Sequence, residues 1–179
     1  MAIAPGTYTL GPADGPLTVR TGKGGAAAKA GHNLVIEVTA WQATLDLADT
    51  ASAAVALTAD ARSLRVRSGS GGISPLGDEE KAGISQTIDE EVLKGGNISY
   101  RSSAVTARYG GFDVEGELDL LGVTRPLAFA LTLDGEHLTG SAQVKQTDWR
   151  MKPYSALFGT LKVADVVEVS IDATLPKGT

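Results

Sequence analysis

Few side chains in this sequence are of the types that carry out chemistry, and their spacing argues against most kinds of catalysis. The histidines number two, His32 and His137, and cysteine is absent. Zinc and iron sites need several histidine, cysteine or carboxylate ligands at close spacing, so neither a metal site nor a cofactor is expected. No Ser-His-Asp order and no Gly-x-Ser-x-Gly elbow stands out. Both histidines are therefore expected to be structural or exposed.

A short run of arginines is a candidate for recognising a charged group. It comprises Arg62, Arg65 and Arg67. Guanidinium groups pair with phosphate or carboxylate oxygens in a forked geometry. The alternative is a solvated strand face that needs no function. The candidate polar contacts to a charged group of a ligand are His32, Arg62 and Arg65.

One stretch carries carboxylates at alternate positions: Asp113, Glu115, Glu117 and Asp119. The positions between them are apolar or glycine. A period of two is that of a strand with one dry and one wet face, so these acids are expected to meet water rather than to act as catalysts. Residues 122–126 are expected to form a turn, because Gly122 tolerates positive φ and Pro126 fixes its own φ. Alternation resumes through Leu133, which predicts an antiparallel hairpin.

The same alternation recurs along the chain and predicts strands at 7–10, 17–21, 32–39, 41–47, 55–60, 97–108, 138–146 and 165–175. Residues 78–94 break this rhythm, because Ile84, Ile88 and Val92 recur every four residues. Acids crowd the start of this segment and Gly95 follows its end, as in a helix. Thr87 with Glu90 could form a capping box, which would make two short helices of it. Residues 22–31 lack the order of a phosphate loop and are expected to be a connection.

These elements predict one all-β domain over residues 1–179, with one or two short helices at about 78–94. Many antiparallel strands must stack or close on themselves to bury their apolar faces, and a closed soluble barrel is favoured. A net charge of −5 argues against a nucleic-acid partner. No apolar run is long enough for a membrane-spanning helix, and few aromatics are present to form the girdles of a membrane barrel.

The first residues of the sequence contain neither a basic region nor an apolar run, so no signal peptide is visible. A cytoplasmic location is therefore expected, or a periplasmic or secreted one if a leader has been removed. Short strands leave edges that a second copy of the chain could cover, so a homodimer stays open as an alternative, although no segment points to an interface.

The hairpin also carries a resemblance. Its run from Gly116 to Leu127 fits the pattern G-x-L-x-L-x-G-V-T-[KR]-P-[VL], which is similar to that of the YceI-like family of polyisoprenoid-binding, lipocalin-like barrels. Three supporting stretches lie in the expected order: 8–10, 59–64 and 163–171. The resemblance implies an extended antiparallel barrel whose interior holds a long-chain isoprenoid or similar amphipathic lipid. It implies no catalytic residues.

A barrel of this kind would turn the apolar face of its strands toward the ligand. The candidate lining residues on strands are Leu34, Ile36, Val38, Leu45, Leu57, Phe112, Leu118, Leu127, Phe129, Leu131, Val144, Val169 and Ile171. A loop at 149–161 adds large side chains that would either line the mouth of the barrel or plug its end: Trp149, Met151, Tyr154 and Phe158.

Three functions follow from these observations. The preferred one is binding, sequestration or transport of a lipid inside the barrel. The second is an enzyme acting on such a lipid, with His32 or an arginine as the polar participant. The third is a filled, ligand-free barrel that serves as a structural or partner-binding scaffold.

Overall fold

The computed structural model describes residues 3–49, 52–156 and 161–177. Its strands are β1 (Gly6–Leu10), β2 (Leu17–Arg20), β3 (Lys23–Gly24), β4 (His32–Val38), β5 (Trp41–Asp49), β6 (Ser52–Asp60), β7 (Leu64–Gly71), β8 (Asn97–Arg108), β9 (Gly111–Leu120), β10 (Val123–Asp134), β11 (His137–Lys145), β12 (Ser155–Ala156), β13 (Leu161–Val163) and β14 (Val166–Thr174). The helical elements are α1 (Asp78–Thr87), the single π turn η3 (Ile88–Leu93), and the short turns η1 (Ala28–Ala30), η2 (Ala61–Ser63) and η4 (Gln146–Trp149).

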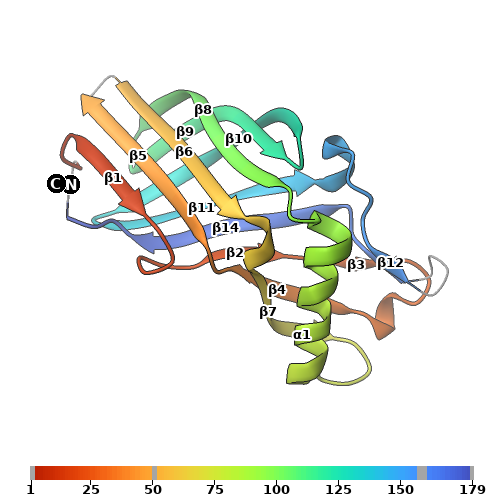
Figure 1. Cartoon of the computed structure of the whole chain (residues 1–179). Helices are drawn as coiled ribbons and strands as arrows, with labels where there is room; N and C mark the ends of the chain where they lie inside the picture. The colour runs from red at the N-terminus through yellow and green to blue at the C-terminus, as the bar shows by residue number, and fades with distance from the viewer. Residues whose placement is uncertain (1–2, 50–51, 157–160, 178–179) are drawn as a thin grey trace.

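Eleven antiparallel strands form one curled sheet in the order β1-β5-β6-β8-β9-β10-β11-β14-β2-β4-β7 (Figure 1). A bent hairpin brings its two ends together. β4 runs into β5, β6 runs into β7, and β4 pairs with β7 while β5 pairs with β6. At the bend, Thr39 N–H donates to Ser63 O and Asp60 N–H donates to Ala40 O, both at 2.9 Å. The expected lipocalin-like, all-β architecture is confirmed, as a strongly curled half-barrel.

The hairpin of β9 and β10 has the two faces that the alternation predicted, and the acids opposite the buried face are exposed or half-buried. In its register Leu127 pairs with Gly116 and Phe129 with Val114. The predicted turn at 122–126 is wrong in its position. Leu121 and Gly122, with φ of 56° and 83°, form a two-residue turn, and β10 begins at Val123. Positive φ at both central residues matches the right-handed twist of the flanking strands.

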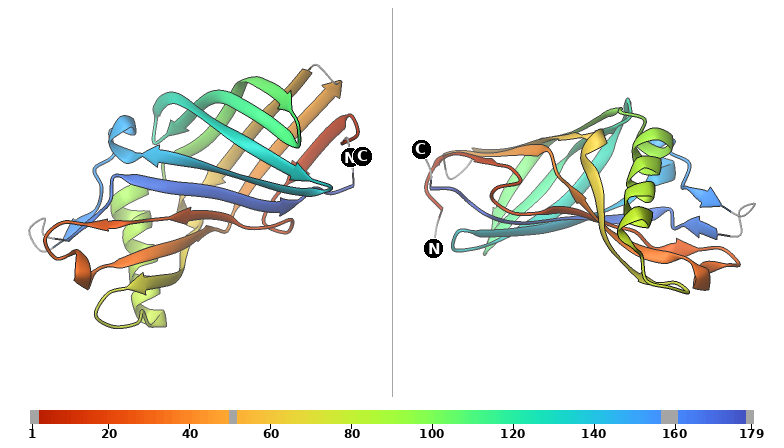
Figure 2. Two further views of the ribbon diagram at one scale, coloured as in Figure 1. Left: turned by 180° about the vertical axis from the view of Figure 1, so that it is seen from behind. Right: turned by 60° about the horizontal axis from the view of Figure 1, so that its bottom comes forward.

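The helical excursion is one continuous rod rather than two helices. α1 passes directly into η3, a π turn that ends at Lys94, whose φ of 52° is left-handed. The predicted capping box at Thr87 is wrong, because Thr87 has helical dihedrals and its Oγ1 donates to Gly83 O at 3.1 Å. Gly77 is the N-cap of α1, and its N–H donates to the carboxylate of Glu80 at 2.7 Å. This rod packs against β7 and crosses one end of the sheet (Figure 2).

Two further segments differ from the prediction. Residues 64–71 were not among the predicted strands, yet they form β7, which pairs with β4. Part of the expected loop at 149–161 joins the expected connection at 22–31 in a three-stranded sheet of order β12-β13-β3. This small sheet stands at the same end of the molecule as α1, and both termini lie at the other end (Figures 1 and 2).

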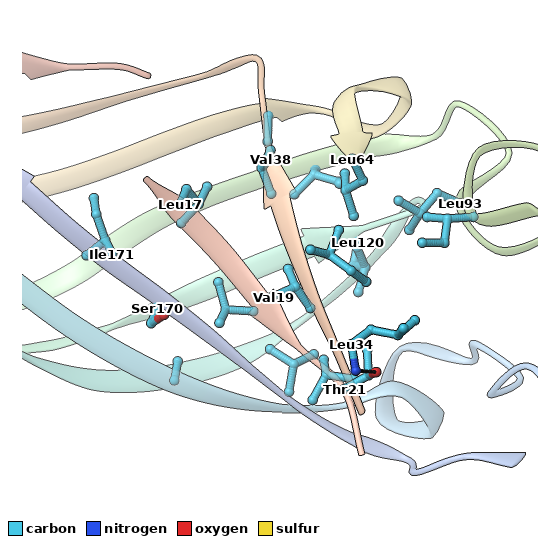
Figure 3. A pocket seen from close by; sticks show the side chains of 18 of the residues that line it. Leu17, Val19, Thr21, Leu34, Val38, Leu64, Leu93, Leu120, Ser170 and Ile171 are labelled. Carbon is cyan, nitrogen blue, oxygen red and sulfur yellow. Dashed lines mark hydrogen bonds between the residues drawn. The ribbon is translucent and has the colours of Figure 1, made fainter. Parts of the chain in front are cut away.

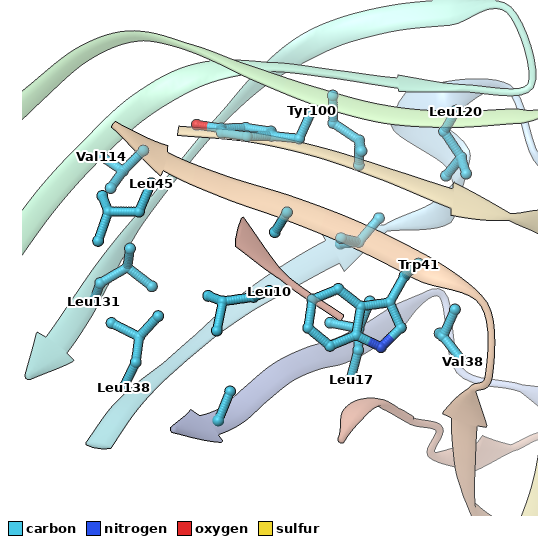
Figure 4. Packing of buried hydrophobic residues seen from close by; sticks show 14 of the residues in the cluster. Leu10, Leu17, Val38, Trp41, Leu45, Tyr100, Val114, Leu120, Leu131 and Leu138 are labelled. Carbon is cyan, nitrogen blue, oxygen red and sulfur yellow. The ribbon is translucent and has the colours of Figure 1, made fainter. Parts of the chain in front are cut away.

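The end of the curled sheet near the termini is filled. There Leu10, Leu45, Val114, Leu131 and Leu138 converge from five strands, each at most 5% exposed (Figure 4). Close packing of this kind stabilises a fold by the apolar area that it removes from water, about 25 cal/mol per Å². This end therefore works as the core of the domain and leaves the other end free for a cavity.

Candidate functional site

An apolar cavity of about 730 Å³ occupies the half of the curled sheet nearest α1 (Figure 3). Its closed end is formed by core side chains such as Leu10, Leu45 and Leu138, and its wall reaches Tyr154 beside the three-stranded sheet. On β11 and the start of η4 the lining runs from Leu138 to Gln146. At ~3.3 Å per residue and a strand tilt of ~40°, this is a length of about 20 Å along the barrel. The volume and length suit a slim, extended ligand.

Half-buried side chains on the inner face show that this region is hollow. Leu34, Ile98, Phe129, Val167 and Val169 point inward, yet each keeps part of its surface accessible. In a filled barrel these positions would be buried like those near the termini. The surface they expose is internal, so a ligand of matching shape would remove it from water.

The helical rod supplies the wall that the sheet lacks. Ile84, Ile88 and Val92 line the cavity from α1 and η3, together with Leu76 from the preceding loop and Leu93. The spacing of four residues places the first three on one face of the helix. Ser85 fixes this face against the sheet, because its Oγ donates to Lys81 O and accepts from Val66 N–H at 3.0 Å.

The cavity wall is nearly free of charge. Among the described residues that line it, Glu80 is the single carboxylate, no lysine or arginine is present, and Glu80 is held by the Gly77 N–H. His32 also lines the wall, and its Nε2 lies 2.7 Å from the Ser74 carbonyl oxygen, which requires the proton on Nε2. An unpaired charge would cost several kcal/mol inside such a wall. This wall therefore disfavours a charged group on any ligand that enters the cavity.

Tyr100 is the buried polar aromatic of the wall. Its hydroxyl donates to Leu127 O at 2.9 Å, and its ring packs against Phe129 with centroids 5.1 Å apart. Burial raises the pKa of Tyr100 to about 12, and the negative charge of Glu115 adds to the effect. The phenol is therefore neutral throughout the physiological range and presents an aromatic face to the cavity.

Most of the lining residues expected from the sequence do lie on this wall. They are Leu34, Ile36, Val38, Leu45, Leu57, Leu118, Leu127, Phe129, Leu131, Val144, Met151, Tyr154, Val169 and Ile171, with His32 among the polar candidates. These residues come from strands across the whole sheet, because the same alternation of apolar residues identified them on each strand.

The remaining candidates lie elsewhere. Phe112 and Trp149 are buried away from the cavity, and the indole N–H of Trp149 donates to Leu118 O at 2.9 Å. Arg62 lies in η2 with its Nε 4.0 Å from Asp89 Oδ1, and Arg65 donates to the carbonyls of Arg62 and Leu64. Neither arginine lines the cavity. Phe158 lies outside the described residues.

The sequence interpretation missed the lining contributed by the helical rod and by the small sheet. The rod carried a signal, the repeat of Ile84, Ile88 and Val92, which marks an apolar helix face in need of a partner. Thr21 continues the alternation of Leu17 and Val19, and all three line the cavity although none was among the candidates. Val163 carried no signal, because β13 has only three residues.

The described residues contain no group of three histidines, cysteines or carboxylates placed to hold a metal ion. Within the same residues, none of the helices is long and apolar enough to cross a membrane.

Fold and cavity together define a class, that of lipocalin-like barrels with an apolar interior open at one end. The family model of the YceI-like domain matches residues 17–175, and the chain belongs to this family. The family is in general one of polyisoprenoid-binding proteins rather than of enzymes.

A solved structure has the same fold. The crystal structure of BcnA from Burkholderia cenocepacia is similar over 87% of this chain and 94% of that chain, with a TM-score of 0.56 and 16% sequence identity. At this identity the similarity concerns the fold alone. No curated protein matches the chain.

Proposed function

We propose that the protein binds a long-chain isoprenoid or similar amphipathic lipid in its cavity and so sequesters or carries it. The supporting observation is the nearly uncharged cavity of about 730 Å³ whose wall consists mainly of leucine, isoleucine and valine. Each methylene group transferred from water into such a wall contributes about 0.8 kcal/mol, against an association cost of about 4–15 kcal/mol. A long chain is therefore needed to bind tightly, and a short acyl chain is not enough.

Direct extraction is the first test. The protein is purified without detergent, extracted with organic solvent, and the extract analysed by mass spectrometry. A prenyl or other long-chain lipid in stoichiometric amount is expected. Empty protein that also fails to bind a dansyl-labelled polyprenol would contradict the proposal.

A matched pair of variants tests whether the ligand lies in the cavity. Ala142 lines the wall, and its neighbour Gln143 is exposed on the outer face of the same strand. Ala142→Phe fills part of the cavity and is expected to weaken polyprenol binding at least tenfold. Gln143→Phe adds the same ring outside the barrel and is expected to bind as the wild type does. Equal binding by both variants would place the ligand elsewhere.

A further inference from the structure

A cluster of cations stands at the part of the cavity that Ala30, Tyr154 and Val163 line, which we call the mouth, in a chain that is acidic as a whole. We name residues 22–31, 150–156 and 161–164 the basic flap; they include β3, η1, β12 and β13. The flap contains Lys23, Lys29, Arg150, Lys152 and Lys162 and no acid, although the chain has 21 acidic and 16 basic residues. The flap is therefore positively charged, whereas the chain as a whole has a net charge of −5.

The backbone pairing of the small sheet holds these cations together. On β13, Lys162 pairs with Ser155 of β12 and with Gly24 of β3. β13 therefore joins residues 150–156 to residues 22–31. Lys152 and Lys162 line one open hollow of the flap, together with Gly24, Gly25 and Asp165. Two lysines beside an open hollow suit the negative charge of a phosphate-bearing headgroup.

The flap lysines are available for an external partner. Lys29, Lys152 and Lys162 are exposed, and none of them forms an ion pair with a carboxylate in the part of the chain that the structure describes. The carboxylate beside the hollow is Asp165, and both of its oxygens accept hydrogen bonds from Thr147. These bonds leave Asp165 negatively charged, but the two lysines that line the hollow outnumber this one carboxylate, so the flap as a whole stays positively charged.

Tyr154 links the flap to the cavity. It lies in the flap, lines the cavity and is still 40% exposed. Tyrosine is suited to the headgroup level of a bilayer, where its ring meets apolar chains and its hydroxyl meets water. Carboxylates occupy a different side of the mouth, the first turn of α1, with Asp78, Glu79 and Glu80. Cationic and anionic side chains therefore lie on different sides of the mouth.

We propose that the basic flap docks on the surface of an anionic lipid bilayer, so that the cavity mouth faces the leaflet from which a lipid enters. The first turn of α1, being acidic, is turned away from the membrane by the same field. Lysines near an anionic surface gain attraction that falls off within a Debye length, so the docking is reversible and sensitive to salt. This inference rests on the proposed function and adds the route by which the lipid is exchanged.

Flotation with lipid vesicles tests the docking. Wild-type protein is expected to float with vesicles of equal parts phosphatidylglycerol and phosphatidylcholine, and to stay behind with phosphatidylcholine alone. Lys152→Glu with Lys162→Glu is expected to weaken binding to the anionic vesicles at least tenfold. The control is Lys94→Glu with Lys177→Glu, two exposed positions outside the flap that give the same net charge. It is expected to bind nearly as well as the wild type.

Two outcomes overturn the docking: wild-type protein that ignores anionic vesicles, and equal weakening in both double variants. A separate measurement keeps this result distinct from the carrier function. Binding of dansyl-labelled polyprenol presented in neutral detergent micelles is expected to be unchanged in the flap variant, whereas its transfer from anionic vesicles is expected to slow by the factor lost in flotation. Normal transfer by a variant that no longer floats would also overturn the proposal.

Discussion

The hydroxyl oxygen of Tyr100 occupies the space that a side chain at Gly116 would need. A Cβ built on Gly116 would lie 2.6 Å from this oxygen and closer still to the carbonyl oxygen of Arg101. The two residues sit on neighbouring strands, β8 and β9, and both face the interior. The glycine of the family hairpin motif therefore lets the Tyr100 ring lie flat against the wall and reach the Leu127 carbonyl.

Gly116→Ala should destabilise the domain. The new methyl group meets backbone atoms of β8, which cannot move aside as a flexible side chain would, so the free energy of unfolding is expected to fall by about 1–3 kcal/mol. Gly83→Ala is the control, because a Cβ there meets nothing within 4 Å. In the middle of α1 that change is expected to raise the free energy of unfolding by about 0.5–1 kcal/mol. Urea denaturation measures both, and a G116A protein as stable as the wild type would contradict the account.

The buried phenol of Tyr100 should make stability depend on alkaline pH. Its pKa rises from 10.0 in the unfolded chain to about 12 in the folded protein, chiefly through burial. The folded state therefore holds the proton more firmly. The resulting stabilisation is complete below pH 10 and is lost as pH rises from 10 to about 12. Tyr100→Phe removes this contribution, so the stability difference between wild type and Y100F should shrink over that interval in urea denaturation series. A constant difference would argue against the burial of this hydroxyl.

Alternation of apolar residues was enough to predict most of the long strands and which of their side chains face inward, but not β7 or the three short strands of the small sheet. It could not place the hairpin turn, because the turn uses Leu121 at a φ of 56°. A branched apolar residue is rarely found there, and Gly122 and Pro126 gave a stronger signal. The turn is set by pairing of the flanking strands rather than by the preference of Leu121 itself.

The cavity could not be predicted from pattern alone. Periodicity shows that Val114 and Phe129 both point inward, but it does not show that Val114 meets the packed core and Phe129 an open space. That difference depends on the curvature of the sheet and on the rod that holds it open. The placement of charged side chains shows a related limit. Arg62 lies in η2 and Arg65 on the outer face of β7, whereas Lys152 and Lys162 meet at one hollow through a small sheet with no periodic signal.

The two tryptophans offer an internal comparison. Both are buried, with Trp149 4% and Trp41 6% exposed. The indole N–H of Trp149 donates to Leu118 O, whereas that of Trp41 has no hydrogen-bond partner among the described residues. Trp→Phe removes the same atoms at either site. Trp149→Phe also breaks a hydrogen bond and should lower the free energy of unfolding by about 1–2 kcal/mol more than Trp41→Phe does. Equal losses would show that the Trp149 bond contributes nothing net.

Ser85 should control how firmly the helical rod covers the cavity. Its hydroxyl is buried between α1 and β7, where it accepts from the Val66 N–H on the last strand of the sheet order. Ser85→Ala leaves that N–H without its partner, at an expected cost of about 1–3 kcal/mol. Because the loss falls on the contact between rod and sheet, amide hydrogen exchange at Val66 and along α1 should accelerate more than at Val114 in the core.

A second serine provides the control for this change. Ser103 is exposed, and its hydroxyl makes one long bond of 3.3 Å to Glu115 O. Ser103→Ala should change stability by no more than about 0.5 kcal/mol and leave the exchange of α1 as it was. If S85A accelerated exchange evenly over the whole domain, the rod and the sheet would unfold as one unit. If the helical rod loosens by itself, the faster amide exchange should be confined to the rod and β7. These are the two elements between which the cavity wall would open.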